Sequence, residues 1–458
     1  MAITSEFPGL ALRLASGALA SEHELSWLPA WRIRELVGRR EISPVEVTDH
    51  FLKRIEELDP LYHAFRMIDA EGARETARRA EQAVLAGEPL GPLHGIPVAI
   101  KEHVAVKGLA WWDSWTARSL IAPRDSIEVE RLRAAGAVIV GTTVAGLATR
   151  EFGDSELQPQ NPWDRQRVCG DSSSGSACAL ATAMVPLAIA ADGLGSTRLP
   201  AAFCGLVGIN PTRGRVASAN WAELNPKLLS AVSPLTRDVR DSATALSVLA
   251  GPDGRDLMCL PDAPPDYLAS LGHSVRGMKV GWTDDFGFAS THAGPAAAQI
   301  ISAVRTAAFG LTDSGAAISE SGVKIGDPGW ACSVVMGADR TNAIRSEPSG
   351  EDVVRARAKR QAIWNRLSAA FDKYDFLLSP TSQWLAPIRQ EWASAWQSPD
   401  YMKTYSAHTA VSNLLGWPAI SVPAGLVGGV PIGLQILGMP DSEPRMFQLA
   451  EAFMASAR

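Results

Sequence analysis

Residues 169–191 read CGDSSSGSACALATAMVPLAIAA, so that a cluster of glycines and serines leads directly into an almost unbroken apolar run. A flexible linker would stay polar on both sides of the serines. The apolar run from Ala177 to Ala191 is instead long enough for a buried helix followed by a buried strand. The stretch therefore predicts a serine-rich loop at the start of a core helix, with a core strand after it.

Strand and helix patterns alternate on both sides of this stretch. Residues 44–58 predict an amphipathic helix, because Ser43 and Glu46 have capping-box spacing and apolar residues recur every three or four positions. Helices are also expected at 71–86 and 126–135. Short apolar runs indicate buried strands, and these lie at 95–106, 137–143, 278–282, 374–380, 419–425 and 432–438.

Such alternation is typical of an α/β protein. We expect one large domain, with a mixed, mostly parallel β-sheet core flanked by helices on both faces. Residues 1–27 are a weakly patterned N-terminal segment, and residues 28–458 form the domain. Within it, the stretch from about 252 to 370 is expected to be a peripheral, variable helical region.

The composition argues against several classes of function. A net charge of −6 without a Lys/Arg-rich run argues against binding to nucleic acid or to an anionic membrane. Five scattered cysteines without C-x-x-C spacing indicate reduced thiols and a cytoplasmic location. No metal-binding motif is present, and no apolar run reaches the ~18 residues of a membrane span. We therefore expect no metal, no cofactor and no membrane contact.

The segment ADGLGSTRLPAAFCG, residues 191–205, has the features of a catalytic loop. Its glycines allow a tight turn that points several backbone N–H groups at one place, as in an oxyanion hole. The expected donors are Gly193, Leu194, Gly195 and Ser196, and Ser196 is the candidate nucleophile. No G-x-S-x-G motif accompanies a histidine base. Lys101, at the end of an apolar run, can serve as the base if burial keeps its amine uncharged.

Five motifs in order resemble the amidase signature family. They are GIPVAIKE, NPWD, the Gly/Ser cluster near 170–176, DGLGSTRLPAAFCGLVGINPT and PAISVPAG…GVPIGLQILG, and the resemblance runs from about Ala30 to Ala457. It implies a single α/β domain around a large mixed sheet, with a Ser-cisSer-Lys triad.

Carried over by motif, the triad is Lys101, Ser172 as the bridging serine in a cis peptide, and Ser196 as the nucleophile. The two serines are 24 residues apart, which agrees with the family's usual interval. The resemblance also implies that Ser173 supports the triad by hydrogen bonding. Asp192 and Arg198 are expected to orient the nucleophile's turn rather than to react.

The chain departs from the family's pattern near these residues. Asp171 and Ser174 stand where the family commonly has glycine, and Leu194 replaces a glycine of the oxyanion loop. The residues after the lysine, commonly Asp-Asn, are Glu102 and His103. We expect these changes to alter the range of substrates rather than the triad.

Aromatic residues follow the lysine motif in the segment GLAWWDSWTARS. Trp111, Trp112 and Trp115 are candidate walls of a substrate pocket, together with His103 and Asp171, and they favour a hydrophobic or aryl substrate. The alternative is that the tryptophans pack against a neighbouring loop.

These observations predict a serine hydrolase that cleaves C–N bonds of small hydrophobic or aryl amides or carbamates (urethanes), with possible esterase activity, through an acyl-enzyme on Ser196. The expected partner is a small-molecule amide or carbamate, without nucleic acid, and the choice between monomer and homodimer stays open. One alternative is the glutaminase subunit of a tRNA-dependent amidotransferase, against which the tryptophans speak. Another is a non-catalytic binding relative, favoured only by Asp171 and Leu194.

Overall fold

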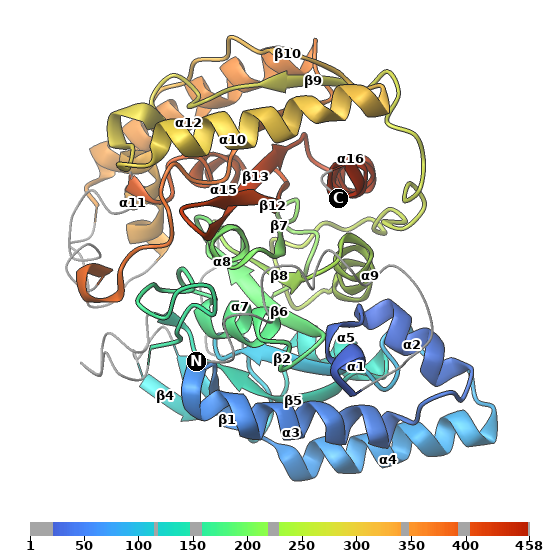
Figure 1. Ribbon diagram of the computed structural model, residues 1–458. Coiled ribbons are helices and arrows are strands. Elements are labelled where there is room, and N and C mark those ends of the chain that lie inside the picture. The colour runs from blue at the N-terminus through green and yellow to red at the C-terminus, as the bar shows by residue number, and fades with distance from the viewer. Residues whose placement is uncertain are drawn as a thin grey trace.

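The central feature of the computed structural model is an 11-stranded sheet that runs through the middle of the molecule (Figure 1). The structure describes residues 22–113, 118–146, 158–218, 229–339, 348–392 and 404–456. Across the sheet the strands are β1 (Phe65–Ile68), β5 (Val138–Thr143), β2 (Pro97–Lys101), β6 (Leu187–Asp192), β8 (Ala231–Thr236), β7 (Val207–Asn210), β12 (Ala419–Val427), β13 (Val430–Leu437), β11 (Phe376–Pro380), β9 (Lys279–Trp282) and β10 (Ala317–Glu320). Two further strands, β3 (Ala110–Asp113) and β4 (Arg118–Ile121), pair antiparallel in a separate two-stranded sheet.

The sheet is mixed, as expected, but its parallel pairs are confined to two regions. β5, β2 and β6 are parallel to one another, as are β11, β9 and β10. The pairs between β6 and β11 are antiparallel, as is the pair of β1 with β5. Parallel pairs are therefore four of ten, fewer than the alternation of helices and strands predicts. One reason is local: β12 returns into β13 through a tight turn at Gly428 and Gly429, and strands joined in this way pair antiparallel.

Helices cover both faces of this sheet. Those of the N-terminal half are α1 (Glu22–Trp27), α2 (Ala30–Gly38), α3 (Pro44–Tyr62), α4 (Ala70–Ala86), α5 (Ile127–Ala134), α7 (Ser174–Ala181), α8 (Arg198–Cys204) and α9 (Val239–Leu249). The others are α10 (Ala297–Phe309), α11 (Gly329–Asp339), α12 (Gly350–Phe371), α15 (Ala410–Leu415) and α16 (Glu443–Ser456), with short 3₁₀ turns at Ala289–His292 and Gly310–Ser314. The sequence predicts α3, α4 and α5 close to these bounds.

Alternation along the strands separates two cores. In β2, Val98 and Ile100 join a cluster with α2, α5, α9, α10 and α16, whereas Ala99 joins a second cluster with α7. Lys101 shares the face of Ala99, because successive side chains of a strand point to opposite faces. The strand therefore directs its lysine toward the serine-rich start of α7.

Local signals in the sequence account for the helix ends. The Glu46 N–H donates to Ser43 Oγ (3.1 Å) and the Ser43 N–H donates to Glu46 Oε2 (2.8 Å), so the predicted capping box is present at α3. α4 ends where Gly87 adopts a φ of 73°.

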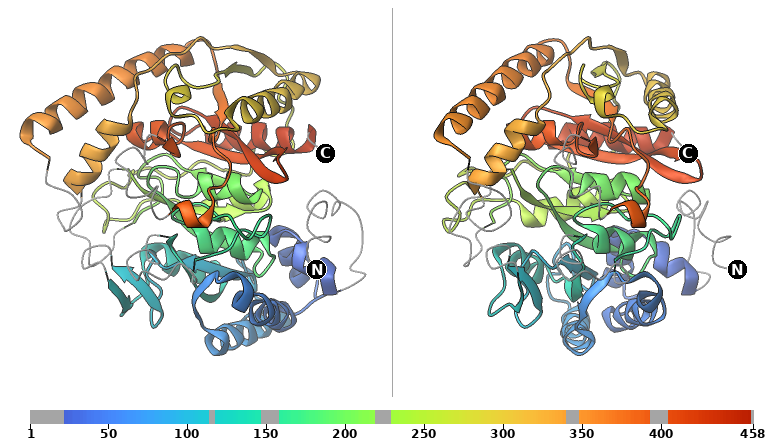
Figure 2. Two further views of the ribbon diagram at one scale, coloured as in Figure 1. Left: turned by 60° about the vertical axis from the view of Figure 1, so that its left-hand side comes forward. Right: turned by 90° about the vertical axis from the view of Figure 1, so that its left-hand side faces the viewer.

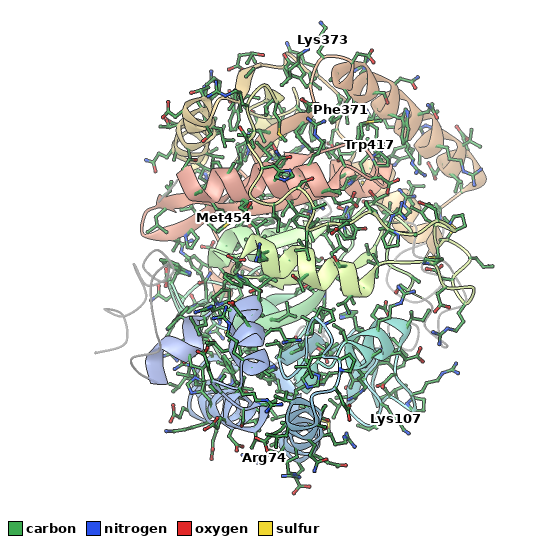
Figure 3. The ribbon with its side chains drawn as sticks, turned by 90° about the vertical axis from the view of Figure 1, so that its right-hand side faces the viewer. Arg74, Lys107, Phe371, Lys373, Trp417 and Met454 are labelled. Atoms are coloured by element: carbon green, nitrogen blue, oxygen red, sulfur yellow. The ribbon has the colours of Figure 1, made fainter. Side chains whose placement is uncertain are left out.

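Helices α3 and α4 lie at the opposite end of the molecule from β9, α10, β10 and α12 in all three ribbon views (Figures 1 and 2). Residues 252–370 contain the expected helices α10, α11 and α12, but they also supply β9 and β10 at one edge of the sheet. In this half, the ring of Phe371 meets that of Trp417 edge-on at a centroid distance of 5.4 Å (Figure 3). The Trp364 ring meets Trp417 in the same way at 5.0 Å. Of the expected N-terminal segment, residues 1–21 lie outside the described residues. Among the described helices, none combines the length and apolar character needed to cross a bilayer.

Candidate active site

The carboxyl ends of β2 and β6 bring together the two loops that the sequence singles out. The strands are parallel neighbours, with Ile100 opposite Ile189, so Lys101 and Asp192 end at the same edge of the sheet. Functional groups commonly gather at such an edge, because the loops that leave adjacent parallel strands begin there.

Lys101 is buried among hydroxyl groups. Its side chain is 1% exposed, and Nζ lies 2.6 Å from Ser172 Oγ and 3.0 Å from Ser173 Oγ. Nζ also lies 3.3 Å from the carbonyl oxygen of Ala191 in β6. The structure thus places the predicted lysine against both predicted serines of the Gly/Ser cluster.

The serine segment is held between two other loops. The peptide bond between Asp171 and Ser172 is cis, as the resemblance implies. The Ser172 carbonyl accepts from the Gly146 N–H (3.0 Å), and the Ser173 N–H donates to the Ser196 carbonyl (3.2 Å). Ser173 therefore links the lysine to the backbone of the candidate nucleophile, and α7 begins at the next residue.

The loop from 193 to 196 has a defined arrangement of peptide groups. The Gly195 N–H donates to Asp192 Oδ1 (2.7 Å), and the Gly195 carbonyl accepts from the Leu199 N–H (2.7 Å). Because C=O and N–H of one trans peptide point in opposite directions, the Ser196 N–H points away from α8. Among the described residues, none accepts from the N–H groups of Leu194 or Ser196.

This geometry changes the expected oxyanion hole. The sequence places Gly195 among the donors, but its N–H is committed to Asp192. Leu194 is 6% exposed, and its φ is not positive. The leucine side chain, at a position where the family has glycine, therefore requires no left-handed backbone. The N–H groups of Gly193, Leu194 and Ser196 have no acceptor among the described residues, so of the four expected donors these three stay candidates.

A fully buried ion pair lies directly beneath the loop. Arg198 Nε donates to Asp192 Oδ2 (2.9 Å) and Nη2 donates to Oδ1 (3.0 Å), and both side chains are 0% exposed. Burial by itself raises the pKa of Asp192. The positive charge of Arg198 and the hydrogen bonds from Arg198, Asn413 and the Gly195 N–H outweigh burial, so the pKa of Asp192 is lowered. Asp192 thus bonds both to Arg198 and to the Gly195 N–H of the turn, and the orienting role of this pair stays a prediction.

No sequence motif assigns a role to several residues that bind this ion pair or the loop above it. Arg198 also donates to Ser412 Oγ (2.8 Å) and Gln435 Oε1 (2.8 Å), and Asn413 Nδ2 donates to Asp192 Oδ1 (3.0 Å). Thr409 Oγ1 donates to the Leu194 carbonyl (2.7 Å). These residues lie more than 200 positions along the chain from the loop, and no local pattern marks them.

Glu102 has a structural position next to the lysine. Its carboxylate is 0% exposed, accepts from the Ala145 N–H (2.7 Å) through Oε1 and lies 3.5 Å from Arg66 Nε through Oε2. Burial raises the pKa of Glu102, and the hydrogen bond from Ala145 and the charge of Arg66 only partly oppose this. Ala145 precedes Gly146, so Glu102 supports the loop that holds the Ser172 carbonyl.

Of the three tryptophans predicted to line the pocket, the structure describes two, and both are buried. Trp111 is 0% exposed and packs with Ala105 and Ala122, which agrees with the alternative that it is a packing residue. Trp112 is also buried, and its backbone N–H donates to the backbone carbonyl of Glu102 (2.7 Å). Trp115 lies outside the described residues. Trp111 and Trp112 therefore do not argue against a polar substrate.

The remaining two predicted pocket residues lie beside the lysine and the serines. His103 is partly exposed two positions after the lysine, and Asp171 is buried beside Gly146, where an added Cβ would lie 2.8 Å from its Oδ1.

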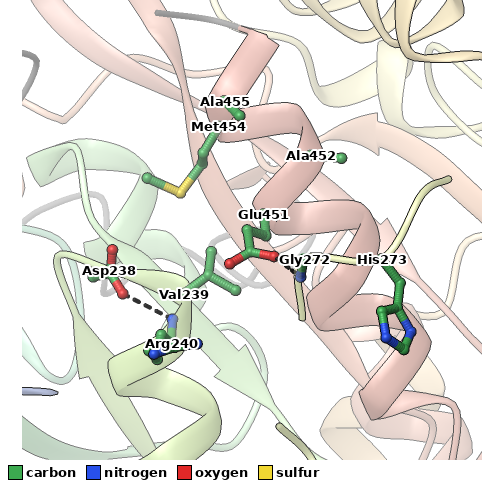
Figure 4. A pocket seen from close by; sticks show the side chains of 9 residues that line it. All are labelled: Asp238, Val239, Arg240, Gly272, His273, Glu451, Ala452, Met454 and Ala455. Carbon is green, nitrogen blue, oxygen red and sulfur yellow. Dashed lines mark hydrogen bonds between the residues drawn. The ribbon is translucent and has the colours of Figure 1, made fainter. Parts of the chain in front are cut away.

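No cluster of three His, Cys, Asp or Glu side chains suited to a metal ion occurs in the part of the chain that the structure describes. A cavity of about 460 Å³ lies elsewhere, between the first turn of α9 and the end of α16 (Figure 4). Glu451 borders it and accepts from the Gly272 N–H (2.5 Å). Its described lining residues include none of the predicted site residues.

The amino-acid sequence and the fold were both compared with known proteins. Residues 46–324 and 324–447 match the family described as Amidase. A glutamyl-tRNA(Gln) amidotransferase subunit from Synechococcus sp. (strain WH7803) is 33% identical over 93% of this chain and 96% of its own length. The solved structure of the corresponding protein from Thermotoga maritima is 26% identical, covers 94% of this chain and 93% of its own, and superposes with a TM-score of 0.73. A bacterial aryl acylamidase of the amidase signature family superposes with a TM-score of 0.80 at 24% identity, over 94% of this chain and 96% of its own.

These relatives overturn one expectation. From the motifs and the net charge of −6 we expect a small-molecule amide or carbamate as the partner, without nucleic acid. The exclusion of nucleic acid and the restriction to a small molecule as the sole partner are wrong, because the matched relatives are named as a subunit of a glutamyl-tRNA(Gln) amidotransferase. A moderate net charge describes the whole surface and does not exclude a local contact. The matches extend from the α3 region to the last helix and include every predicted triad residue, so the chain belongs to the amidase signature family.

Proposed function

We propose that this chain cleaves the C–N bond of an amide through an acyl-enzyme on Ser196, with Ser172 as the proton relay and Lys101 as the base. The single observation that carries the proposal is the position of the buried Lys101 Nζ, 2.6 Å from Ser172 Oγ. Ser173, bonded to the Ser196 carbonyl, keeps the serine segment against the nucleophile's loop.

The proposed reaction begins with attack of Ser196 Oγ on the amide carbonyl carbon. The Ser196 proton passes to Ser172 Oγ as the Ser172 proton passes to the uncharged amine of Lys101. The N–H groups of Leu194 and Ser196 stabilise the oxyanion, each by roughly 3 kcal/mol. The proton then returns through Ser172 to the leaving nitrogen, the C–N bond breaks, and water releases the acyl group by the reverse route.

An uncharged amine fits the surroundings of Lys101. Its side chain is 1% exposed, and removal from water disfavours an ammonium more than a neutral amine. The two hydroxyl groups near Nζ can donate to its lone pair or accept from its hydrogens. They therefore suit both protonation states that the relay requires.

For the acyl donor we propose a hydrophobic or aryl amide or carbamate, with esters open to the same attack. Leu194 belongs to the same buried apolar cluster as Phe286, Trp392 and Tyr405. The Tyr405 ring packs on Trp384 and Trp392 at centroid distances of 5.0 and 5.2 Å. An apolar acyl or amine group is the chemistry that such surroundings favour next to the oxyanion loop.

A second candidate is the glutamine-hydrolysing component of an amidotransferase. It is favoured by the amidotransferase relatives, which are 31–35% identical over more than nine-tenths of the chain. In that case the acyl donor is the carboxamide of glutamine, and the leaving group is ammonia. Burial of Trp111 and Trp112 weakens the objection that the three tryptophans raise against this candidate.

The test compares three donors with the purified chain: an aryl anilide, an aryl carbamate and glutamine, with release of amine or ammonia as the readout. Ser196→Ala should lower every activity by at least about 1,000-fold. Ser247→Ala is the matched control, because Ser247 is exposed on α9 and donates only within its helix. Full activity of Ser196→Ala contradicts the acyl-enzyme, whereas turnover of glutamine alone selects the second candidate.

We also place the reaction in the cytoplasm. All five cysteines are described and unpaired, and four of them are buried, as suits a reducing compartment. Fractionation of the native cells checks this, and recovery in an oxidising compartment contradicts it.

A further inference from the structure

We propose that Thr409 is a positioning residue that fixes the orientation of the oxyanion loop through its hydroxyl group. The inference rests on the proposed function, because it concerns the donors that would stabilise the acyl-transfer intermediate. Thr409 is 0% exposed and directly precedes α15, far from the loop in sequence.

The hydroxyl group of Thr409 binds the loop's backbone. Oγ1 lies 2.7 Å from the Leu194 carbonyl oxygen and 3.3 Å from the Ser406 carbonyl oxygen. A hydroxyl has one hydrogen to donate, and the shorter contact is the one to Leu194. The same hydroxyl makes no capping bond to α15, so its bond to the loop is not a by-product of starting that helix.

The peptide between Leu194 and Gly195 is therefore held at both ends. Its carbonyl oxygen accepts from Thr409, and its N–H donates to Asp192 Oδ1 (2.7 Å). Reversing this peptide would leave the hydroxyl without its acceptor and turn the carbonyl oxygen toward a carboxylate. Fixing this one plane restricts the two neighbouring planes, which carry the N–H groups of Leu194 and Ser196.

Gly195 independently shows how closely the loop approaches Thr409. Its φ is +118°, and an added Cβ would lie 2.3 Å from Thr409 Oγ1. The loop thus approaches Thr409 so closely that no side chain fits between them. Such an approach brings the hydroxyl within bonding distance of the carbonyl and leaves the loop little room to shift.

The backbone of Thr409 has a separate role that substitutions of its side chain leave intact. The Thr409 carbonyl accepts from Arg198 Nη2 (3.0 Å), and one turn later Ser412 Oγ accepts from Nη1 (2.8 Å). Any residue at position 409 keeps the first of these bonds. A change of side chain therefore removes the clamp on Leu194 without removing the support of the ion pair.

The test is a pair of substitutions, Thr409→Val and Thr409→Ser, measured with the best substrate found for the wild-type protein. Valine keeps the shape and lacks the hydroxyl, whereas serine keeps the hydroxyl. We expect Thr409→Val to lower kcat by about 30- to 100-fold with KM changed by less than about threefold, because loss of a whole oxyanion donor costs roughly 10²–10³. Thr409→Ser should stay within about threefold of wild type.

Thr306→Val is the matched control, since the exposed Thr306 on α10 also donates to a backbone carbonyl (2.9 Å) and should leave kcat unchanged. Thermal unfolding and circular dichroism verify folding, and Thr409→Ala replaces the valine variant if that variant does not fold. The inference is overturned if the valine variant keeps wild-type kcat, if valine and serine act alike, or if only KM changes. Its failure is separable from failure of the proposed function: Ser196→Ala decides the latter.

Discussion

Replacement of Arg198 by methionine tests how the buried ion pair supports the site. Methionine fills much of the space but removes the guanidinium, which is 0% exposed and binds both Asp192 oxygens. The same change removes the donors to Ser412 Oγ and Gln435 Oε1, both at 2.8 Å. The principal loss is the partner of a carboxylate that is itself 0% exposed.

The loss of stability follows from leaving the buried carboxylate of Asp192 without its charged partner. Removing one partner of a buried pair costs roughly 3–5 kcal/mol, against a total stability of about 5–15 kcal/mol for a typical domain. At pH 7 we expect the free energy of unfolding to fall by about 4 kcal/mol. Adding Asp192→Asn to Arg198→Met should recover at least about 2 kcal/mol, because the charge is then gone.

The loss should also depend on pH in a defined direction. In the wild-type protein the pKa of Asp192 is lowered from 3.8, so its contribution to stability is present above that value and is lost as the pH falls through the folded pKa. Without Arg198, burial raises this pKa, and the variant loses stability as the pH rises above 3.8. The difference between the two proteins should therefore grow between about pH 5 and pH 7, by up to about 1.4 kcal/mol per pH unit.

Urea unfolding at about pH 5, 6 and 7, followed by tryptophan fluorescence, measures these differences. The reasoning is refuted if Arg198→Met loses less than about 1 kcal/mol, if its loss is the same at all three pH values, or if the double variant is no more stable than the single one. Each result would mean that Asp192 is solvated or paired in another way when the arginine is absent.

Three further predictions concern single positions. Lys101→Met should lower kcat/KM by about 10²–10⁴ with an unchanged or raised melting temperature, because a buried amine is replaced by an apolar chain of similar length; an active variant would exclude the base role. Gly195→Ala should abolish measurable turnover, since its Cβ would lie 2.3 Å from Thr409 Oγ1, and a wild-type rate would show that the loop has room to move. Ser43→Ala should cost about 1 kcal/mol in urea unfolding through loss of the bond from the Glu46 N–H, with no change in kcat, and an unaltered midpoint would show that water replaces the cap.

The sequence predicts the parts of this fold that depend on neighbouring residues. The capping box at Ser43 and the glycine end of α4 are recognisable because all their partners lie within a few positions. The pairing of strands is less predictable. β11 has β13 on one side and β9 on the other, and nothing within residues 376–380 specifies those neighbours or their directions.

In the candidate site, too, the sequence reveals some features and not others. Lys101 and the serines are identifiable because a strand end, two glycine-rich loops and the family's spacing all mark them. The hydrogen bond from the Gly195 N–H to Asp192 cannot be identified from the sequence, although the two residues are only three positions apart. The orientation of a peptide group depends on what the loop packs against. Burial of Trp111 in a small core of its own is also hidden, because an aromatic residue suits a pocket and a core equally well.

Directional hydrogen bonds explain why this loop is supported by polar rather than apolar residues. Apolar packing fixes volume, but it does not decide which way a peptide group points. Asp192 and Thr409 each bind one end of the same peptide, and Arg198 and Asn413 hold that carboxylate and the 409–413 segment together. A buried ion pair adds little net stability over an apolar core of the same size. We infer that its value here lies in geometry: the network holds the peptide groups on either side of Leu194 and Gly195 in one direction, and one of its members is a hydroxyl 215 positions away in the chain from Leu194.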